Sequence, residues 1–402
     1  MKRSDFLFLW HSVAAYVRSG YGGCTRHIVG RLAKRGFKFV TTHYYGIDSG
    51  GVLIINGVPA LPAKTGSFGE LSVRHYVKTL KPNMAILHTD PWAFPWFPTL
   101  PCLTMSYGPL DHILYPENLQ DLMRQYDYRV APAKFTVEEW GSYDPPIHFD
   151  WIPHGVDTSI YKPMDKKRAK QFYKIDPESF VIGMVGANSD KEPRKNWTGM
   201  LKAIRIFLDN NPDVRDVRCI IYTNPKDQRG VDIELFLRKY KLADITITQS
   251  PFVFETGIKD EEMARLYNAF DVLLHASYRE GFGICMYEAM ACGVPVIAHD
   301  FSSMTEAIVE ENGRRHGWLA KTAVYVDTPI GATSAIPDVY DIAKCIDKAY
   351  FKEKQRKRYG RYAREFALKF DWDRIVDDMW VPYLDRIIEE SKPKPLKDRR
   401  LV

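Results

Sequence analysis

The fold is inferred from the stretch REGFGICMYEAMACGVPVIAHD, Arg279–Asp300, which contains several successive elements. The turn Gly281-Phe282-Gly283 precedes a run with helical spacing, Ile284–Cys292, and Gly293 follows as a helix C-terminal stop. Residues 294–298 then form an apolar run without polar alternation, which is typical of a strand buried on both faces. The stretch therefore predicts a loop, a helix, a turn and a buried strand.

Two carboxylates flank this glycine turn. Glu280 precedes the turn, and Glu288 lies farther along the predicted helix. Backbone N–H groups at the start of a helix bind phosphate readily. Because like charges repel, the carboxylates suit hydroxyl groups on either side of a phosphate rather than the phosphate itself. A ligand with a sugar, a diphosphate and a second sugar has this order, which points to a nucleotide-sugar.

The pair Glu280 and Glu288, with G-F-G after the first and E-A-M-A-C-G around the second, resembles a known family. It is similar to the retaining glycosyltransferases of the GT-B fold, of the glycosyltransferase family 4 (group 1) type. The resemblance implies two Rossmann-like domains, each a doubly wound parallel sheet, which face each other across a cleft. It also implies that a C-terminal helix returns to the first domain. Glu280 would contact hydroxyls of the donor sugar, and Glu288 the nucleotide ribose.

The length of the chain agrees with two domains. A chain of 402 residues exceeds one ordinary core, and predicted strands and helices alternate throughout, as in α/β folds. We expect an N-terminal acceptor-binding domain over residues 1–157, completed by a C-terminal helix at about 374–392. A donor-binding domain is expected over residues 158–373, and a disordered tail over residues 393–402.

The N-terminal half opens with a strand, a glycine-rich loop and a helix. Phe6–Trp10 is predicted as the strand, Ser19–Gly23 as part of the loop, and Cys24–Lys34 as the helix. The loop spacing departs from the G-x-G-x-x-G of dinucleotide-binding folds. The resemblance instead places Gly22 and Gly23 near the donor phosphates, and a glycine turn without a ligand is the alternative.

A further candidate follows the predicted buried strand Met84–Leu87. Polar groups at the carboxyl end of a parallel strand face the ligand crevice. His88 matches a family histidine that reaches the donor sugar, and a structural histidine is the alternative. Asp90 is a weaker candidate, since Asp-Pro is also an ordinary turn. The Pro- and Trp-rich segment Pro91–Cys102 is stiff, and we expect either an acceptor-binding loop or a packed surface loop.

Basic residues follow the predicted buried strand Phe180–Ala187. The family carries a lysine in this loop, which Lys195 matches, and often an arginine directly after the strand. Asn188 stands near that arginine position, so half of the usual pair of cations is absent. Whether Asn188, Lys191 or Arg194 replaces the missing arginine stays open. A solvated basic loop is the alternative interpretation.

The resemblance implies a retaining, metal-independent hexosyltransferase that moves a sugar from a UDP- or GDP-sugar to a hydroxyl acceptor such as a glycan, lipid or glycoprotein. No H-E-x-x-H or C-x-x-C metal motif is present, and no cofactor is expected. An epimerase or phosphorylase of the same fold, and a non-catalytic nucleotide-sugar-binding subunit, are the alternatives. The catalytic candidates are Glu280, His88 and Lys195. The donor-binding candidates are Gly22, Gly23, Arg194, Lys195, Gly281, Phe282, Gly283, Ile284 and Glu288.

Composition limits the partners and the compartment. A net charge of +6 and a pI of about 8.8 fit an anionic substrate or an anionic membrane surface, but are too weak to indicate nucleic acid. None of the six cysteines forms a C-x-x-C pair, which favours a reducing, cytoplasmic setting. The early apolar run is interrupted by Asp5, His11 and Arg18, so a strand is preferred to a signal peptide. The sequence indicates no oligomeric state.

Two charged segments near the end of the chain need an interpretation. The basic segment at residues 352–370 is predicted as a solvated helix face, with peripheral membrane association as the alternative. Asp371-Trp372-Asp373 resembles the D-x-D metal motif of the other glycosyltransferase fold. We assign it instead to the N-cap of the last helix, where acidic residues are common.

Overall fold

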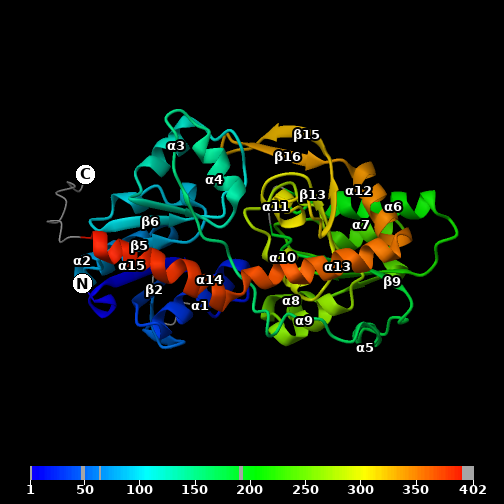
Figure 1. Cartoon of the computed structure of the whole chain (residues 1–402), viewed down its shortest axis with the longest axis horizontal. Coiled ribbons are helices and arrows are strands. Elements are labelled where there is room, and N and C mark those ends of the chain that lie inside the picture. Colours follow the sequence, from blue (N-terminus) through cyan, green and yellow to red (C-terminus); the bar gives the residue numbers. More distant parts are fainter. Residues whose placement is uncertain (1, 47–49, 63–64, 190–192, 392–402) are drawn as a thin grey trace. The chain divides into compact units, whose positions relative to one another are not determined.

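The computed structural model describes residues 2–46, 50–62, 65–189 and 193–391. The chain divides into two compact units (Figure 1). Unit 1 consists of residues 1–110, 114–155 and 372–402, and unit 2 of residues 111–113 and 156–371. Both units are α/β, as predicted, and each is described by itself. The predicted disordered tail, 393–402, lies outside the described residues.

Unit 1 is built on an eight-stranded sheet in the order β3-β4-β2-β1-β5-β6-β7-β8. Neighbouring strands are parallel except β3 and β4, which are antiparallel. The central strands are almost wholly buried, as expected for a parallel sheet covered on both faces. The strands are β1 Leu7–Val13, β2 Lys38–Tyr45, β3 Leu53–Ile55, β4 Val58–Leu61, β5 Met84–Leu87, β6 Leu103–Tyr107, β7 Tyr128–Ala131 and β8 Asp150–Trp151.

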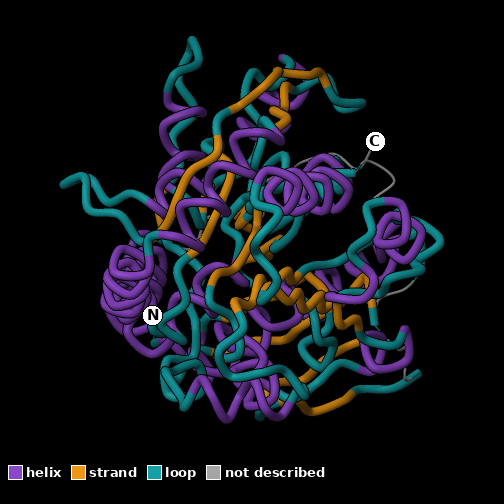
Figure 2. Tube along the Cα trace, turned by 90° about the vertical axis from the view of Figure 1, so that its right-hand side faces the viewer, coloured by secondary structure: helices purple, strands orange, loops and turns teal. Residues whose placement is uncertain are grey.

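Unit 1 also contains helices; Figure 2 colours the helices and strands of the whole chain. The helices of unit 1 are α1 Gly20–Lys34, α2 Glu70–Leu80, α3 Glu117–Arg124, α4 Lys134–Gly141, α14 Trp372–Ile375, the π-helical turn η7 Val376–Trp380, and α15 Val381–Glu390. α1 begins earlier than predicted, because Ser19 caps it by accepting a hydrogen bond from the N–H of Gly22. The glycines expected in the loop therefore form the first turn of the helix.

The C-terminal helices belong to unit 1, which confirms the predicted return of the chain to its first domain. Trp380 is fully buried and packs edge-on against Trp10 and Tyr107, with ring centroids 6.2 and 4.9 Å away. On the surface, Arg35 forms an ion pair with Asp377. The return is thus anchored in the apolar core of the unit as well as by charge.

The acidic pair of the D-x-D motif is divided between different partners. Asp371 accepts hydrogen bonds from the N–H and the hydroxyl of Thr158, at 3.3 and 2.5 Å. Asp373 forms an ion pair with Arg31 at 3.1 Å. Each carboxylate thus has partners within its own unit.

Unit 2 contains a parallel six-stranded sheet in the order β11-β10-β9-β12-β13-β14. A separate antiparallel pair, β15 and β16, was not predicted from the sequence. The strands are β9 Phe180–Val185, β10 Val217–Tyr222, β11 Thr246–Thr248, β12 Val272–His275, β13 Val296–His299, β14 Gly317–Ala320, β15 Thr322–Asp327 and β16 Thr333–Pro337.

Two layers of helices cover this sheet. On one face α6, α7 and α12 share a core with side chains such as Ile182 and Met184 of β9. Between them in sequence, Gly183 lies under the ring of Phe270, and a Cβ atom at Gly183 would come within 2.1 Å of that ring. The helices of the unit are α5 Lys166–Phe172, α6 Trp197–Asn210, α7 Ile233–Lys239, α8 Pro251–Thr256, α9 Asp260–Asn268, α10 Ile284–Ala291, α11 Ser303–Ile308, α12 Val339–Phe351 and α13 Glu353–Ala367.

Among the described residues, no helix combines the length and the apolar character needed to cross a bilayer.

Candidate functional site

The strand order of unit 2 reverses between β9 and β12. The chain moves outwards from β9 through β10 to β11, and then returns to place β12 on the other side of β9. Loops that leave two such adjacent strands diverge, and open α/β sheets bind ligands in the resulting crevice at the carboxyl ends. The loop after β9 carries Arg194 and Lys195, and the loop after β12 carries Glu280.

The structure brings Glu280, Arg194 and Lys195 together at this reversal. The Glu280 carboxylate accepts from Lys195 Nζ at 2.5 Å and from Arg194 Nη1 at 3.3 Å. It also accepts from Ser277 Oγ at 2.8 Å, and His275 Nε2 lies 3.0 Å away. Glu280 is only 5% exposed, so these contacts replace water around a buried charge.

The electrostatics of the cluster favour charged side chains. Burial alone would raise the pKa of Glu280, but Lys195, Arg194 and His275 outweigh it and hold that pKa well below the usual value. Burial lowers the pKa of His275, but Cys285 and Glu280 outweigh it and raise the pKa to about 9. His275 is therefore a cation near neutral pH. Its Nδ1 lies 3.4 Å from the sulfur of Cys285.

The backbone of Glu280 is fixed by two serines. Its N–H donates to Ser302 Oγ at 3.0 Å, and its carbonyl accepts from Ser303 Oγ at 2.7 Å. Ser302 adopts φ +52° and ψ −149°, a conformation that non-glycine residues rarely adopt and that costs about 1–3 kcal/mol. Such strain persists only where the surroundings impose it, which is common at functional sites.

The predicted glycine turn leads into α10. Gly283 has φ +77°, a left-handed backbone that favours glycine, whereas the nearest atom to an added Cβ, Met286 Cε at 2.5 Å, is the end of a flexible side chain. The ring of Phe282 is 2% exposed and stacks on Tyr287 at 4.2 Å, which makes it a core side chain. The turn can therefore offer a ligand its backbone N–H groups, but not the side chain of Phe282. Ile284 is half-buried at the first position of α10.

The second predicted carboxylate, Glu288, is half-buried on the same helix. It accepts a hydrogen bond from the hydroxyl of Tyr267 at 2.7 Å. Burial and Glu288 together raise the pKa of Tyr267 well above the usual value, so this hydroxyl keeps its proton. The contact helps to fix the orientation of Glu288.

Asp111 forms a further carboxylate cluster in unit 2 that sequence reasoning missed. Its oxygens lie 2.8 Å from His112 Nδ1, 3.4 Å from Arg279 Nε and 3.9 Å from Arg194 Nη1. Burial would raise the pKa of Asp111, but His112, Arg279 and Arg194 lower it. Arg194 therefore lies between two ionised carboxylates. Its one local signal was weak: Asp111 lies a few residues beyond the buried strand β6.

The three candidates for the missing arginine differ in their surroundings. Asn188 is buried, and its amide donates to the carbonyls of Asn224 and Val231 while its oxygen accepts from Val231 N–H. These bonds occupy it as a structural residue. Lys191 lies outside the described residues. Arg194, beside Glu280, is the described candidate whose charge lies at the site.

Unit 1 has an equivalent reversal of strand order between β1 and β5. Gly22 lies after β1, in the first turn of α1, and a Cβ atom there would come within 2.2 Å of the carbonyl oxygen of Val17. Glycine at 22 is thus required by close packing of the chain. A Cβ atom at Gly23 would meet no atom within 4 Å, so packing gives no reason for glycine there.

His88 follows β5 and is fully buried. Its ring stacks on Tyr107 with 5.1 Å between centroids, its Nδ1 lies 3.1 Å from Ser12 Oγ, and its Nε2 lies 3.3 Å from His154 Nε2. Burial and the nearby His154 hold the pKa of His88 well below its usual value, so the ring is neutral. Asp90 is half-buried and accepts from Tyr21 Oη at 3.2 Å. Contact between His88 and a donor sugar stays a prediction.

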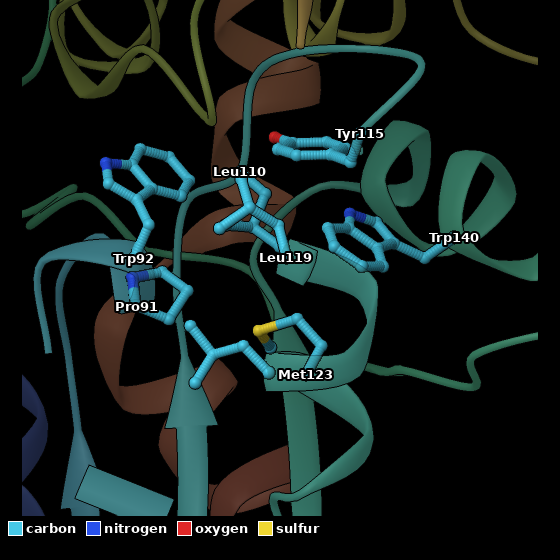
Figure 3. Close-up of a pocket in the computed structure, with 8 residues that line it drawn as sticks. Pro91, Trp92, Leu110, Tyr115, Leu119, Met123 and Trp140 are labelled. Atoms are coloured by element: carbon cyan, nitrogen blue, oxygen red, sulfur yellow. The ribbon is translucent and has the colours of Figure 1, made fainter. Parts of the chain in front are cut away.

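The Pro- and Trp-rich segment is largely packed into unit 1. Phe94, Phe97 and Leu100 are at most 1% exposed. Trp92 borders a cavity of about 10 Å³, which has room for roughly one water molecule (Figure 3). The cavity is lined by Pro91, Trp92, Leu110, Tyr115, Leu119, Leu122, Met123 and Trp140. These observations favour the packed interpretation of the segment.

Curated proteins with similar sequences are glycosyltransferases. The chain is similar to the D-inositol 3-phosphate glycosyltransferase of Paenarthrobacter aurescens (strain TC1), with 26% identity over 229 residues, 56% of this chain and 49% of that protein. The chain spans about half the length of the curated relatives it matches.

Solved structures share the fold. Sucrose-phosphate synthase from Thermosynechococcus elongatus aligns with a TM-score of 0.73 and 16% identity, over 96% of this chain and 100% of that chain. Anabaena HepE in complex with UDP and glucose aligns with a TM-score of 0.70 and 16% identity, over 94% and 100%. Both likenesses agree with the two doubly wound units of the GT-B fold.

The family model for glycosyl transferases group 1 matches residues 165–366, which include the sheet of unit 2 and the Glu280 cluster. That match spans half of the chain. The chain belongs to the glycosyl transferases group 1 family and has the GT-B fold.

Proposed function

We propose that this protein is a retaining glycosyltransferase that moves a hexosyl group from a nucleoside-diphosphate sugar to a hydroxyl acceptor. The observation that carries the proposal is the cluster of Glu280, Arg194 and Lys195 directly before the N-terminus of α10. Family membership supports the class of reaction. The identity of the sugar, the base and the acceptor belongs to the proposal.

The charge of the cluster suits an anionic ligand. Arg194, Lys195, Arg279 and the protonated His275 outnumber the carboxylates of Glu280 and Asp111 (Asp111 and Arg279 form one of the ion pairs). A diphosphate would balance the excess positive charge, and the N–H groups of the first turn of α10 add donors for it. Lys195 has three N–H donors, so it can bind Glu280 and a phosphate oxygen together.

The roles of the residues follow from charge. Glu280 is an acceptor for hydroxyls of the donor sugar, beside the cations that hold the diphosphate. Lys195 and Arg194 stabilise the negative charge that grows on the departing diphosphate, and such preorganised donors contribute most to catalysis. Glu288, a carboxylate on α10 held by Tyr267, binds the ribose hydroxyls of the nucleotide.

In the proposed reaction, the bond between the anomeric carbon and the diphosphate oxygen breaks, and a bond to the acceptor oxygen forms on the same face. The acceptor proton passes to the departing phosphate oxygen, so that charge and atoms balance. This route needs no side-chain nucleophile on the opposite face and retains the anomeric configuration.

A UDP-sugar is the preferred donor in this proposal. The Anabaena relative in the comparison was solved with UDP and glucose, and it shares the fold at 16% identity. A GDP-sugar is the other donor class. Relatives named for transfer to inositol 3-phosphate or for sucrose-phosphate synthesis make small hydroxyl acceptors the first to test.

The deciding experiment screens UDP- and GDP-sugars by thermal shift and by slow hydrolysis of the donor, then measures transfer to an acceptor panel. Glu280→Gln is compared with Glu261→Gln, an exposed glutamate on α9. We expect Glu280→Gln to lower the transfer rate by about a hundredfold or more, as for loss of a transition-state contact. Glu261→Gln should leave the rate unchanged.

Each of the other outcomes contradicts the proposal. Release of an altered nucleotide-sugar without an acceptor would indicate an epimerase. A reaction that depends on inorganic phosphate would indicate a phosphorylase. Donor binding without turnover would indicate a binding subunit. In that case Glu280→Gln should leave the activity of the partner enzyme unchanged.

A further inference from the structure

Asp111 joins the Glu280 loop from outside the stretch that matches the family model. That match covers residues 165–366, whereas Asp111 follows β6. Residues 111–113 belong to unit 2, although residues 110 and 114 on either side belong to unit 1. A short, separate piece of the chain therefore contributes a carboxylate to the charged cluster of unit 2.

The hairpin of β15 and β16 holds this piece of chain. The N–H of Ile113 donates to the carbonyl oxygen of Thr333 at 3.0 Å, and the N–H of Thr333 donates to the carbonyl oxygen of Ile113 at 2.8 Å. The next residue of β16, Ser334, is fully buried, and its Oγ accepts a hydrogen bond from Arg279 Nη1 at 3.1 Å. The start of β16 therefore supports both segment 111–113 and Arg279.

Arg279 is a buried cation directly before Glu280 in the chain. It is only 6% exposed, and a buried guanidinium needs an opposite charge nearby. Asp111 supplies one, since its Oδ1 lies 3.4 Å from Arg279 Nε. The carbonyl oxygen of Arg279 accepts a hydrogen bond from Arg194 Nη1 at 3.2 Å. The backbone of Arg279 thus connects the loop after β12 to the loop after β9.

The second oxygen of Asp111 faces Arg194. Asp111 Oδ2 lies 3.9 Å from Arg194 Nη1, and the same nitrogen lies 3.3 Å from Glu280 Oε2. The guanidinium is therefore attracted from two directions. Because the attraction between opposite charges strengthens as their separation falls, loss of Asp111 would leave Arg194 to turn toward Glu280.

We propose that Asp111 is a positioning residue of the transfer reaction, which anchors Arg279 and directs Arg194 toward the donor diphosphate. The inference rests on the proposed function, in which Arg194 stabilises the departing diphosphate. Asp111 acts through the two arginines and does not contact the reacting atoms. Since a correctly placed cation stabilises the transition state more than the bound donor, loss of Asp111 lowers kcat more than it weakens donor binding.

The test measures donor kinetics of the full chain with Asp111→Asn, which keeps the size of the side chain and removes its charge. We expect kcat for transfer to fall about tenfold or more, while the KM for the donor stays within about threefold of the wild type. Asp209→Asn is the matched control. Asp209 is also an ion-paired aspartate of unit 2, 2.8 Å from Arg205, but it lies near the C-terminal end of α6. Asp209→Asn should keep the wild-type kcat.

A second measurement asks whether Asp111 acts through Arg194. In an Arg194→Gln background, Asp111→Asn should lower kcat by less than about threefold, because no guanidinium remains to be directed. Equal losses in the two backgrounds would overturn the proposal.

Ser334→Ala is a milder variant for the case that Asp111→Asn does not fold. It removes the hydroxyl that accepts from Arg279 and leaves every charge in place. We expect kcat to fall about threefold or more with little change in the donor KM. An unchanged kcat in Ser334→Ala would then overturn the proposal.

The outcomes separate this inference from the proposed function. A wild-type kcat in Asp111→Asn would overturn the inference and leave the proposed function intact. A raised donor KM with an unchanged kcat would also overturn it, because Asp111 would then serve binding alone. A wild-type protein that transfers no sugar from any UDP- or GDP-sugar would instead refute the proposed function.

Discussion

Glu280 is a buried carboxylate whose charge is balanced by residues from two loops. Removing a charge partner from such a group is costly, because the remaining charges lose their compensation in a region that excludes water. The cluster is therefore a preformed set of charges, and its backbone is held by Ser302 and Ser303. A ligand that arrives there meets groups already in place, which reduces the reorganisation needed for reaction.

Glu288 offers a test that separates binding from chemistry. Glu288→Ala removes a carboxylate assigned to the ribose, which is far from the bond that breaks. We expect the KM for the donor to rise about tenfold or more while kcat changes little, since uniform binding is lost. Steady-state kinetics with varied donor concentration measure both. A fall in kcat with unchanged KM would contradict the ribose assignment.

His275 makes the stability of unit 2 depend on pH. Its pKa in the folded protein is about 9, above the ordinary value of 6.5. A raised pKa means that the protonated form stabilises the fold, so the contribution is complete below about pH 6.5 and is lost as the pH rises through about 9. The low pKa of Glu280 acts in the opposite direction, and its contribution disappears only as the pH falls into the acidic range.

We therefore expect the melting temperature of the wild type to fall between neutral pH and pH values above about 9, and to fall less in His275→Gln. Thermal melts of both proteins across this range provide the measurement. Parallel pH curves for the two proteins would mean that His275 does not carry the effect.

Several site residues were predictable because the sequence around them has a local signal. Glu280 and Glu288 flank a glycine turn that opens a helix, and Lys195 follows a buried strand. His275 and Asp111 gave no comparable signal, because their roles arise from contacts that only the folded chain creates. Asp111, for example, meets Arg279 across a long separation in sequence.

At the scale of elements, the starts of α1 and α10 both depend on glycine but for different reasons. Gly283 needs a left-handed backbone and lies against Met286. Gly23 lies within α1 and has open space beside it. The same substitution at the two positions should therefore have opposite effects on stability.

Gly283→Ala should destabilise the protein by about 1–2 kcal/mol, the cost of a left-handed non-glycine residue. Gly23→Ala should stabilise it by up to about 1 kcal/mol, the helix preference of alanine over glycine. If Gly23 lies against donor phosphates, Gly23→Ala should also lose transfer activity despite its higher stability. Urea unfolding and initial rates measure the two effects. Full activity in Gly23→Ala would remove Gly23 from the donor site.

The elements that the sequence predicted are those with a strong pattern. Apolar runs without alternation marked β5, β9 and β13, because both faces of a parallel sheet are covered. The hairpin of β15 and β16 was missed, since the stretch around Pro337 contains the glycine and prolines of a loop and the hairpin stands apart from the main sheet of the unit. The early start of α1 was missed because Ser19 and its glycines also suit a turn.

At the scale of the whole chain, the last helices complete the core of unit 1. Arg31 and Arg35 form ion pairs with Asp373 and Asp377, and both aspartate side chains are more than half exposed. Exposed ion pairs contribute about 0–1 kcal/mol to the free energy of unfolding. Trp380 is fully buried. Apolar packing therefore contributes more than charge to the attachment of the C-terminal segment.

Trp380→Ala should destabilise unit 1 by about 3–5 kcal/mol, the usual cost of truncating a buried aromatic side chain. Trp380→Phe should cost much less, because it keeps most of the ring and removes a buried indole N–H that has no hydrogen-bond partner among the residues the structure describes. Arg35→Ala serves as the comparison for the ion pairs. Urea unfolding measures all three. A larger loss in Arg35→Ala than in Trp380→Ala would contradict the packing argument.

The contact between Gly183 and the ring of Phe270 has a consequence for the history of this sequence. No larger residue fits at 183 while a phenylalanine occupies 270, so position 183 can change only after position 270 has become smaller. In homologues we expect the residues at positions 183 and 270 to covary. A larger residue should occur at 183 only where the residue at 270 is small. An ancestral line that crossed from one pairing to the other must have passed through a small residue at both, and hence through a less stable protein.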